Sequence, residues 1–232
     1  MKHLLLFCGF TIFALISCKK DCVNTPQGYS SDPIRFDSLK VGQKSRYVGL
    51  TGEAYINDSH DIFSYQEDTL TLEITAEDVK GFLVTESLVY AADPSVWIKN
   101  GKDLIYQYYL NVINDTLRII PASDIYVKSR MFQYNITKQG LPLRNVSSLL
   151  LNITGWKTSA PYCECRRFAL ASNYNLFGME YPNLNVLIEN SAMALDGNGE
   201  TYAYSAEYGI VKASTYSWWT QDGYGWDLLT KQ

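Results

Sequence analysis

Alternation of apolar and polar residues runs through most of the chain and constrains its fold more than any other feature. In Thr69–Thr75 the apolar residues are Leu70, Leu72 and Ile74, the spacing of side chains that share one face of a strand. Comparable β-rich runs occur at Phe82–Tyr90, Leu104–Ile113, Thr116–Ile120, Leu184–Glu189, Thr201–Ser205, Gly209–Tyr216 and Trp226–Leu229. We therefore predict an all-β chain of about eight to eleven strands.

The connections between these runs favour a single antiparallel domain. Asn114-Asp115 separates two β-rich runs, and two residues with this turn chemistry predict a hairpin. No break in composition marks a second domain, so residues 34–232 are expected to form one all-β domain: a curved half-barrel sheet, a sandwich or a barrel. Asn145–Ile153 is the one plausible helix, and its β-branched residues disfavour it.

The N-terminus has the features of an export signal. Leu4–Ile16 is an apolar run of 13 residues after a basic start, too short to span a bilayer but suited to a signal peptide. Leu15-Ile16-Ser17-Cys18 resembles the lipobox of bacterial lipoproteins. The resemblance implies a signal peptide over 1–17, a Cys18 that carries three acyl chains such as palmitate, and a polar tether over 18–33.

The residues around Cys18 bear on location. Ser17 to Asp21 (SCKKD) resembles the junction of Bacteroidota-type lipoproteins, many of which reach the outer membrane or the cell surface. The resemblance implies a protein held in the outer membrane by its lipid anchor and facing the periplasm or the cell surface. The membrane is then one expected partner.

The remaining cysteines leave several pairings open. After removal of the signal and acylation of Cys18, Cys22, Cys163 and Cys165 remain in an oxidising compartment. An odd number leaves a free thiol or an intermolecular bond. A bridge between Cys163 and Cys165 would be strained, whereas a bond from Cys22 to either one would fasten the tether to the domain. The Cys163–Cys165 pair has too few further metal-ligating residues beside it to favour a metal site, so we expect no bound metal.

Three Asp-(Ser/Thr)-Leu sequences mark candidate modification sites. They place Ser38, Thr69 and Thr116 after an aspartate. The pattern resembles the O-glycosylation acceptor of exported Bacteroidota proteins, which implies modification at these hydroxyls. The alternative is structural, because Asp-Thr often leads from a turn into a strand.

A short segment near the C-terminus carries a further resemblance. Tyr204–Lys212 (YSAEYGIVK) resembles a strand found in several uncharacterised bacterial lipoprotein and periplasmic families. Some of these are predicted to share the curved half-barrel sheet of lipoprotein carriers. The resemblance implies a sheet wrapped around an apolar concave face, and it transfers no functional residue.

Charge and motifs exclude several functions. The chain has 20 Lys and Arg against 24 Asp and Glu, which gives no electrostatic footprint for nucleic acid. His60 is the one histidine after the signal. No nucleophile elbow, P-loop or dinucleotide fingerprint occurs, so we assign no catalytic residue and expect no cofactor. A carboxylate-based hydrolase is the least favoured function.

The C-terminal region is rich in aromatic residues and gives the candidate binding site. Trp and Tyr have an apolar body and a polar tip and suit a sugar-stacking or apolar-ligand surface. The alternative is a closing strand whose aromatic side chains cover the core. We predict a non-enzymatic binding module for an apolar or glycan ligand, or else an accessory subunit that contacts an envelope protein partner. The predicted ligand-binding residues are Trp218, Trp219, Tyr224 and Trp226.

Overall fold

Antiparallel strands form one continuous, strongly curved sheet. The computed structural model describes residues 29–33, 39–54, 61–89, 104–146, 165–190, 198–217 and 222–232. Within these ranges, eleven strands pair in the order β7-β6-β5-β4-β3-β2-β13-β12-β11-β10-β9. Their bounds are β2 (Lys44–Ala54), β3 (Asp61–Asp78), β4 (Gly81–Val89), β5 (Leu104–Ile113), β6 (Thr116–Pro121), β7 (Leu141–Pro142), β9 (Cys165–Leu176), β10 (Met179–Asn190), β11 (Asn198–Ser205), β12 (Gly209–Ser217) and β13 (Asp222–Lys231).

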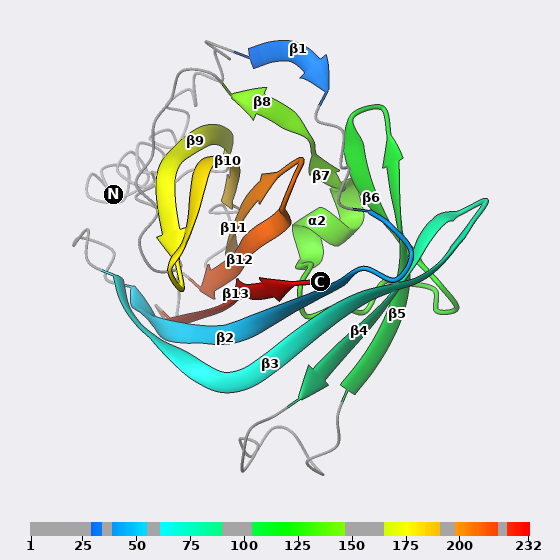
Figure 1. Ribbon diagram of the computed structural model, residues 1–232, viewed down its shortest axis with the longest axis horizontal. Coiled ribbons are helices and arrows are strands. Elements are labelled where there is room, and N and C mark those ends of the chain that lie inside the picture. The colour runs from blue at the N-terminus through cyan, green and yellow to red at the C-terminus, as the bar shows by residue number, and fades with distance from the viewer. Residues whose placement is uncertain are drawn as a thin grey trace, which may run out of the picture.

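The last strand joins two meanders into this single sheet. Strands β2 to β7 follow one another as neighbours, as do β9 to β13, and β13 then pairs with β2. Strands β1 (Tyr29–Pro33) and β8 (Arg144–Val146) pair separately. The large sheet curls into a half-barrel around the short helix α2 (Tyr134–Gln139), as Figure 1 shows. The all-β prediction is confirmed, and its curved-sheet form is the one observed.

The predicted hairpin at Asn114-Asp115 is confirmed. Strands β5 and β6 begin and end within one residue of the predicted runs. Asn114 and Asp115 have φ angles of 48° and 58°, the left-handed conformation that a two-residue hairpin turn of the primed type requires and that Asn and Asp tolerate. Local turn chemistry therefore sets the register of this pair.

The helix lies where the sequence analysis did not predict one. Asn145 and Val146 belong to β8, so the weakly favoured helix over Asn145–Ile153 does not begin there, and residues 147–153 lie outside the described ranges. Helix α2 is followed by Gly140, which caps its C-terminus: the φ of Gly140 is 84°, and its N–H donates to the Ile136 carbonyl at 2.8 Å. No described helix is long and apolar enough to cross a membrane.

The concave face of the half-barrel is filled by the chain itself. We call residues 129–143 the plug segment, because they pass across this face and include α2. The segment contributes buried apolar side chains to the core: Met131, Phe132, Ile136, Leu141 and Leu143. The sheet supplies the facing side chains, among them Leu70, Val84 and Leu117. An apolar ligand on this face would therefore have to displace the plug segment.

Candidate functional site: the Arg130 cleft

A buried glutamate fastens the plug segment to the sheet. Along β4 the residues Val84, Glu86 and Leu88 are buried in alternation, so Glu86 occupies a position that the period of two sends into the core. A carboxyl group there is costly unless its oxygens accept hydrogen bonds. Glu86 is completely buried, and its environment supplies those bonds.

Four donors converge on the Glu86 carboxyl group. Oε2 accepts bonds from the Ser129 hydroxyl at 2.6 Å, the Tyr108 hydroxyl at 3.0 Å and the Met131 N–H at 3.5 Å. Oε1 accepts a bond from the Arg130 N–H. Burial raises the pKa of Glu86, and these hydrogen bonds act against the rise. The start of the plug segment is therefore held by one side chain of β4.

Aromatic side chains of β11 and β13 hold the same segment from the other half of the sheet. The Trp226 indole Nε1 donates to the Arg130 carbonyl at 3.0 Å. The Tyr202 hydroxyl accepts a bond from the Gln133 N–H at 2.9 Å, and the Tyr204 hydroxyl donates to the Pro142 carbonyl at 2.7 Å. Both the N–H and the carbonyl of Arg130 are thus fixed, which limits where its side chain can lie.

A cleft of about 350 Å³ opens between the plug segment and strands β2, β3, β4 and β13. We call it the Arg130 cleft. Its size falls within the range of small-molecule sites. Its polar and aromatic lining comes from four separate parts of the chain: Thr51, Gln66, Asp68, Arg130, Tyr224 and Trp226.

Local irregularities of the strands shape this cleft. Three residues of β3, Gln66 to Asp68, lie opposite the single residue Gly49 of β2, which is a bulge that bends the strand. A Cβ at Gly49 would lie 3.3 Å from the Cβ atoms of Gln66 and Asp68, so glycine gives the bulged residues room. The bulge brings both polar side chains to the lining.

The Arg130 side chain brings a positive charge that is not neutralised by an ion pair within the described ranges. Its Nε atom is buried and has no hydrogen-bond partner there. A buried donor without a partner costs about 1–3 kcal/mol, and most such groups in folded proteins are satisfied. Burial raises the pKa of the Tyr224 hydroxyl, and the nearby positive charge of Arg130 acts against that rise.

Tyr224 and Trp226, two of the predicted binding residues, have different environments. Tyr224 is 43% exposed, and its hydroxyl donates to the Gln133 Oε1 at 2.9 Å. Trp226 is only 6% exposed and belongs to the core cluster, so its main contribution is to support the cleft and Arg130. Trp218 and Trp219 lie outside the described residues.

The other predicted sites are only partly described. Cys18, Cys22, Cys163 and Ser38 lie outside the described ranges, and Cys165 begins β9, where its backbone alone is described. Thr69 lies within β3 between Val48 and Val89, and Thr116 follows the Asn114-Asp115 turn, and both are partly exposed. Thr116 follows a turn, as the structural alternative describes, whereas Thr69 lies in the interior of a strand. Neither position tests modification.

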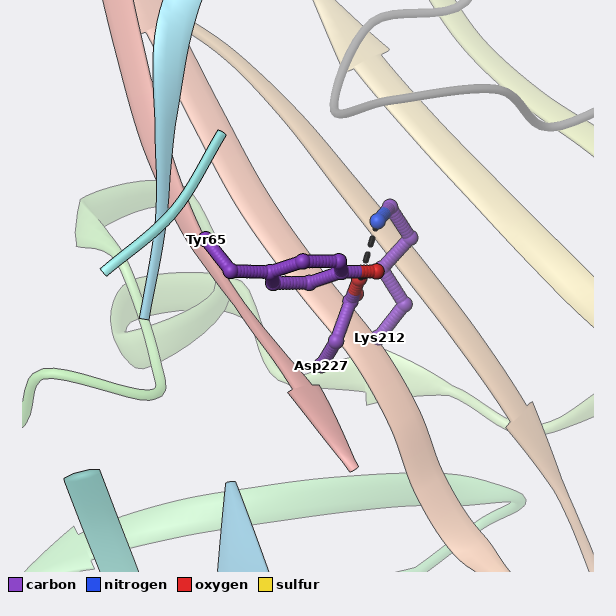
Figure 2. A network of polar contacts seen from close by, with 3 residues as sticks. All are labelled: Tyr65, Lys212 and Asp227. Atoms are coloured by element: carbon purple, nitrogen blue, oxygen red, sulfur yellow. Dashed lines mark hydrogen bonds and ion pairs between the residues drawn. The ribbon is translucent and has the colours of Figure 1, made fainter. Parts of the chain in front are cut away.

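A second polar network contains none of the residues that line the cleft, and no sequence motif predicted it. Lys212 on β12 and Asp227 on β13 form an ion pair of 2.7 Å, with each side chain only 1% exposed. The Tyr65 hydroxyl donates to the other oxygen of Asp227 at 3.0 Å (Figure 2). The two strands place Lys212 and Asp227 directly opposite each other. Because every charged group has a partner, this network has the features of a structural element.

In the described part of the chain, no group of three or more His, Cys, Asp or Glu residues is arranged to hold a metal ion. Comparison of the chain with known protein families, with curated proteins and with solved structures finds no match. The chemistry of the cleft is therefore the basis for an assignment.

Proposed function

We propose that this protein is a non-enzymatic binding module that takes a glycan ligand in the Arg130 cleft. The observation that carries the proposal is the combination of an exposed Tyr224 ring with amide, carboxylate, hydroxyl and guanidinium groups around one cleft. A sugar presents apolar C–H faces and a ring of hydroxyl groups, so it suits an aromatic ring flanked by planar polar side chains.

The structure gives less support to the apolar ligand that the sequence analysis left open. The large concave face would be its natural site, and the plug segment occupies that face with Met131, Phe132 and Ile136. A cavity beside Phe132, near Tyr47 and Leu72, has a volume of only about 40 Å³. The Arg130 cleft is open without displacement of the plug segment.

A glycan array tests the proposal, with neutral and acidic oligosaccharides printed together. We expect saccharide binding that Tyr224→Ala weakens at least about tenfold, a change of about 1.4 kcal/mol. Tyr126→Ala is the matched control, since Tyr126 is 66% exposed and lies outside the cleft lining. Absence of saccharide binding, or equal binding by the wild type and Tyr224→Ala, would contradict the proposal.

We further propose that the module is anchored in the outer membrane through acylated Cys18, on the strength of the lipobox-like Leu15-Ile16-Ser17-Cys18. Growth of the source cells with labelled palmitate tests the anchor. The wild type should incorporate label and fractionate with the outer membrane, whereas Cys18→Ala should do neither. Equal labelling of the two proteins would contradict the anchor.

An accessory subunit of an envelope complex is the second candidate, and β9 favours it. This twelve-residue strand lies at the edge of the sheet. Phe168–Leu176 contains no charged residue and no proline, the residues that usually protect an edge strand from pairing with another chain. Native mass spectrometry of the protein purified from its own membrane should then show a stoichiometric protein partner. Ser172→Lys, at an exposed position of β9, should remove the partner. A partner-free chain would contradict this candidate.

A further inference from the structure

The Arg130 side chain indicates which glycans the cleft selects. Its backbone is fixed by Glu86 on the N–H side and by Trp226 on the carbonyl side, and the Gln133 side chain also donates to the same carbonyl at 3.1 Å. The backbone that carries the guanidinium is therefore held in place. Arginine presents a planar fork of donors that matches a carboxylate or a phosphate with two parallel hydrogen bonds.

The partner of this fork is not supplied by the described chain. The Nε atom of Arg130 is buried without a hydrogen bond among the described residues, and the Arg130 side chain lines a cleft large enough for a small ligand. An anionic group in the cleft would pair with the guanidinium charge and could accept hydrogen bonds from its terminal nitrogens. The positive charge in the lining, unpaired within the described ranges, thus indicates an anionic ligand.

The remaining lining favours a carboxylate over a phosphate. Asp68 contributes a negative charge to the same cleft, and like charges repel more strongly when the ligand carries close to two negative charges than when it carries one. A carboxylated sugar has a single charge, and its hydroxyl groups can donate to Asp68 and contact Gln66 and Thr51. Tyr224 supplies the surface for the ring.

We infer that the Arg130 cleft binds a carboxylated saccharide, such as a uronic acid or a sialic acid, with the Arg130 guanidinium holding the carboxylate and Tyr224 contacting the sugar ring. The inference rests on the proposed function and specifies its ligand class. The cleft takes one sugar unit or the terminal unit of a longer chain, because its volume is near the lower end of the range for ligand sites.

Calorimetric titration with matched methyl glycosides tests the inference. The probes are glucuronic acid with glucose, galacturonic acid with galactose, and N-acetylneuraminic acid, all as methyl glycosides. We expect at least one uronic acid to bind about tenfold or more tightly than its neutral counterpart, because a charge-assisted bidentate contact is stronger than a neutral one. Inorganic phosphate at the same concentration should bind more weakly than that acid.

Variants of one side chain separate charge from geometry. Arg130→Gln should abolish the preference for the acid, because the affinity for the acid should fall much more than the affinity for the neutral sugar. Arg130→Lys keeps the charge and loses the fork, so it should retain only part of the preference. Arg46→Gln is the control, because Arg46 is exposed on β2 and outside the cleft lining and loses the same charge.

The outcomes distinguish this inference from the proposed function. Equal affinity for acid and neutral sugars, a preference that survives in Arg130→Gln, or tighter binding of phosphate would overturn the carboxylate inference and leave a glycan module intact. If none of the saccharides binds to the wild type, the proposed function itself fails. Thermal unfolding of each variant establishes that it is folded before its titration is interpreted.

Discussion

The buried pair Lys212–Asp227 gives a sharp energetic prediction. Each side chain is only 1% exposed and the two charges are 2.7 Å apart, so removal of one partner leaves an uncompensated buried charge. Lys212→Met should therefore lower the free energy of unfolding by about 3–5 kcal/mol. The Tyr65 hydroxyl would then be the remaining partner of Asp227 among the contacts in Figure 2.

Replacement of both charges should reverse most of that loss. The double variant Lys212→Met/Asp227→Leu removes both desolvation costs, so its stability should lie within about 1 kcal/mol of the wild type or exceed it. Tyr65 is 42% exposed, and water can satisfy its hydroxyl. Urea unfolding of the wild type, the single variants and the double variant completes a double-mutant cycle.

An exposed pair provides the control for this cycle. Lys44 and Glu73 lie 2.9 Å apart with side chains 46% and 40% exposed, so Lys44→Met should cost less than about 1 kcal/mol. If Lys212→Met costs no more than Lys44→Met, the argument from burial is wrong. If the double variant is as unstable as Lys212→Met, uncompensated charge is not the source of the loss.

The remaining predictions concern the fastening of the plug segment and the packing of β13. Glu86→Gln should lower the free energy of unfolding at pH 7 by about 1–3 kcal/mol in urea titrations. The amide NH₂ group is a donor, and it would face either the Arg130 N–H or the donors at Oε2, which need an acceptor. An unchanged stability would contradict the four-donor arrangement. Burial raises the pKa of Glu86 above its ordinary value of 4.5, so the native state keeps a proton that the unfolded chain has released. Wild-type stability should therefore fall as the pH rises from about 4.5 through the raised pKa, and parallel pH profiles for the wild type and Glu86→Gln would refute this. Gly225→Ala should cost about 1–3 kcal/mol, because its Cβ would lie 2.7 Å from the Ala213 carbonyl oxygen. Gly49→Ala, whose nearest contacts are 3.3 Å, should cost less in the same unfolding assay, and an equal cost would refute the argument from close approach.

The parts of the fold that the sequence predicted are those specified by local signals. The runs Leu104–Ile113 and Thr116–Ile120 alternate strongly and are joined by two residues that tolerate positive φ, so their hairpin could be predicted from a short window. Helix α2 has only six residues, too few for a helical period to appear, and its stability comes from burial of Ile136 against the sheet. Gly140 was the available signal for its C-terminus.

The candidate site was less accessible to prediction because it is assembled across the sheet. Tyr224 was predicted from the aromatic character of the C-terminal region, whereas Glu86 and Arg130 occur in no motif. Their roles depend on the curvature that brings β4, β13 and the plug segment together. One local signal was present: Glu86 interrupts an alternating row of apolar residues in β4, and a carboxylate at such a position requires partners from elsewhere in the chain.

The most direct test of the glycan cleft is the NMR signal of the Arg130 side chain itself. Titration of ¹⁵N-labelled protein with methyl glucuronide should shift the Arg130 Nε–H resonance, together with the ring signals of Tyr224, and the shifts should saturate with one ligand per chain. The Arg46 Nε–H resonance serves as the internal reference and should remain in place. If saccharide binds while the Arg130 and Tyr224 signals stay unchanged, the ligand lies elsewhere and the assignment of this cleft is wrong.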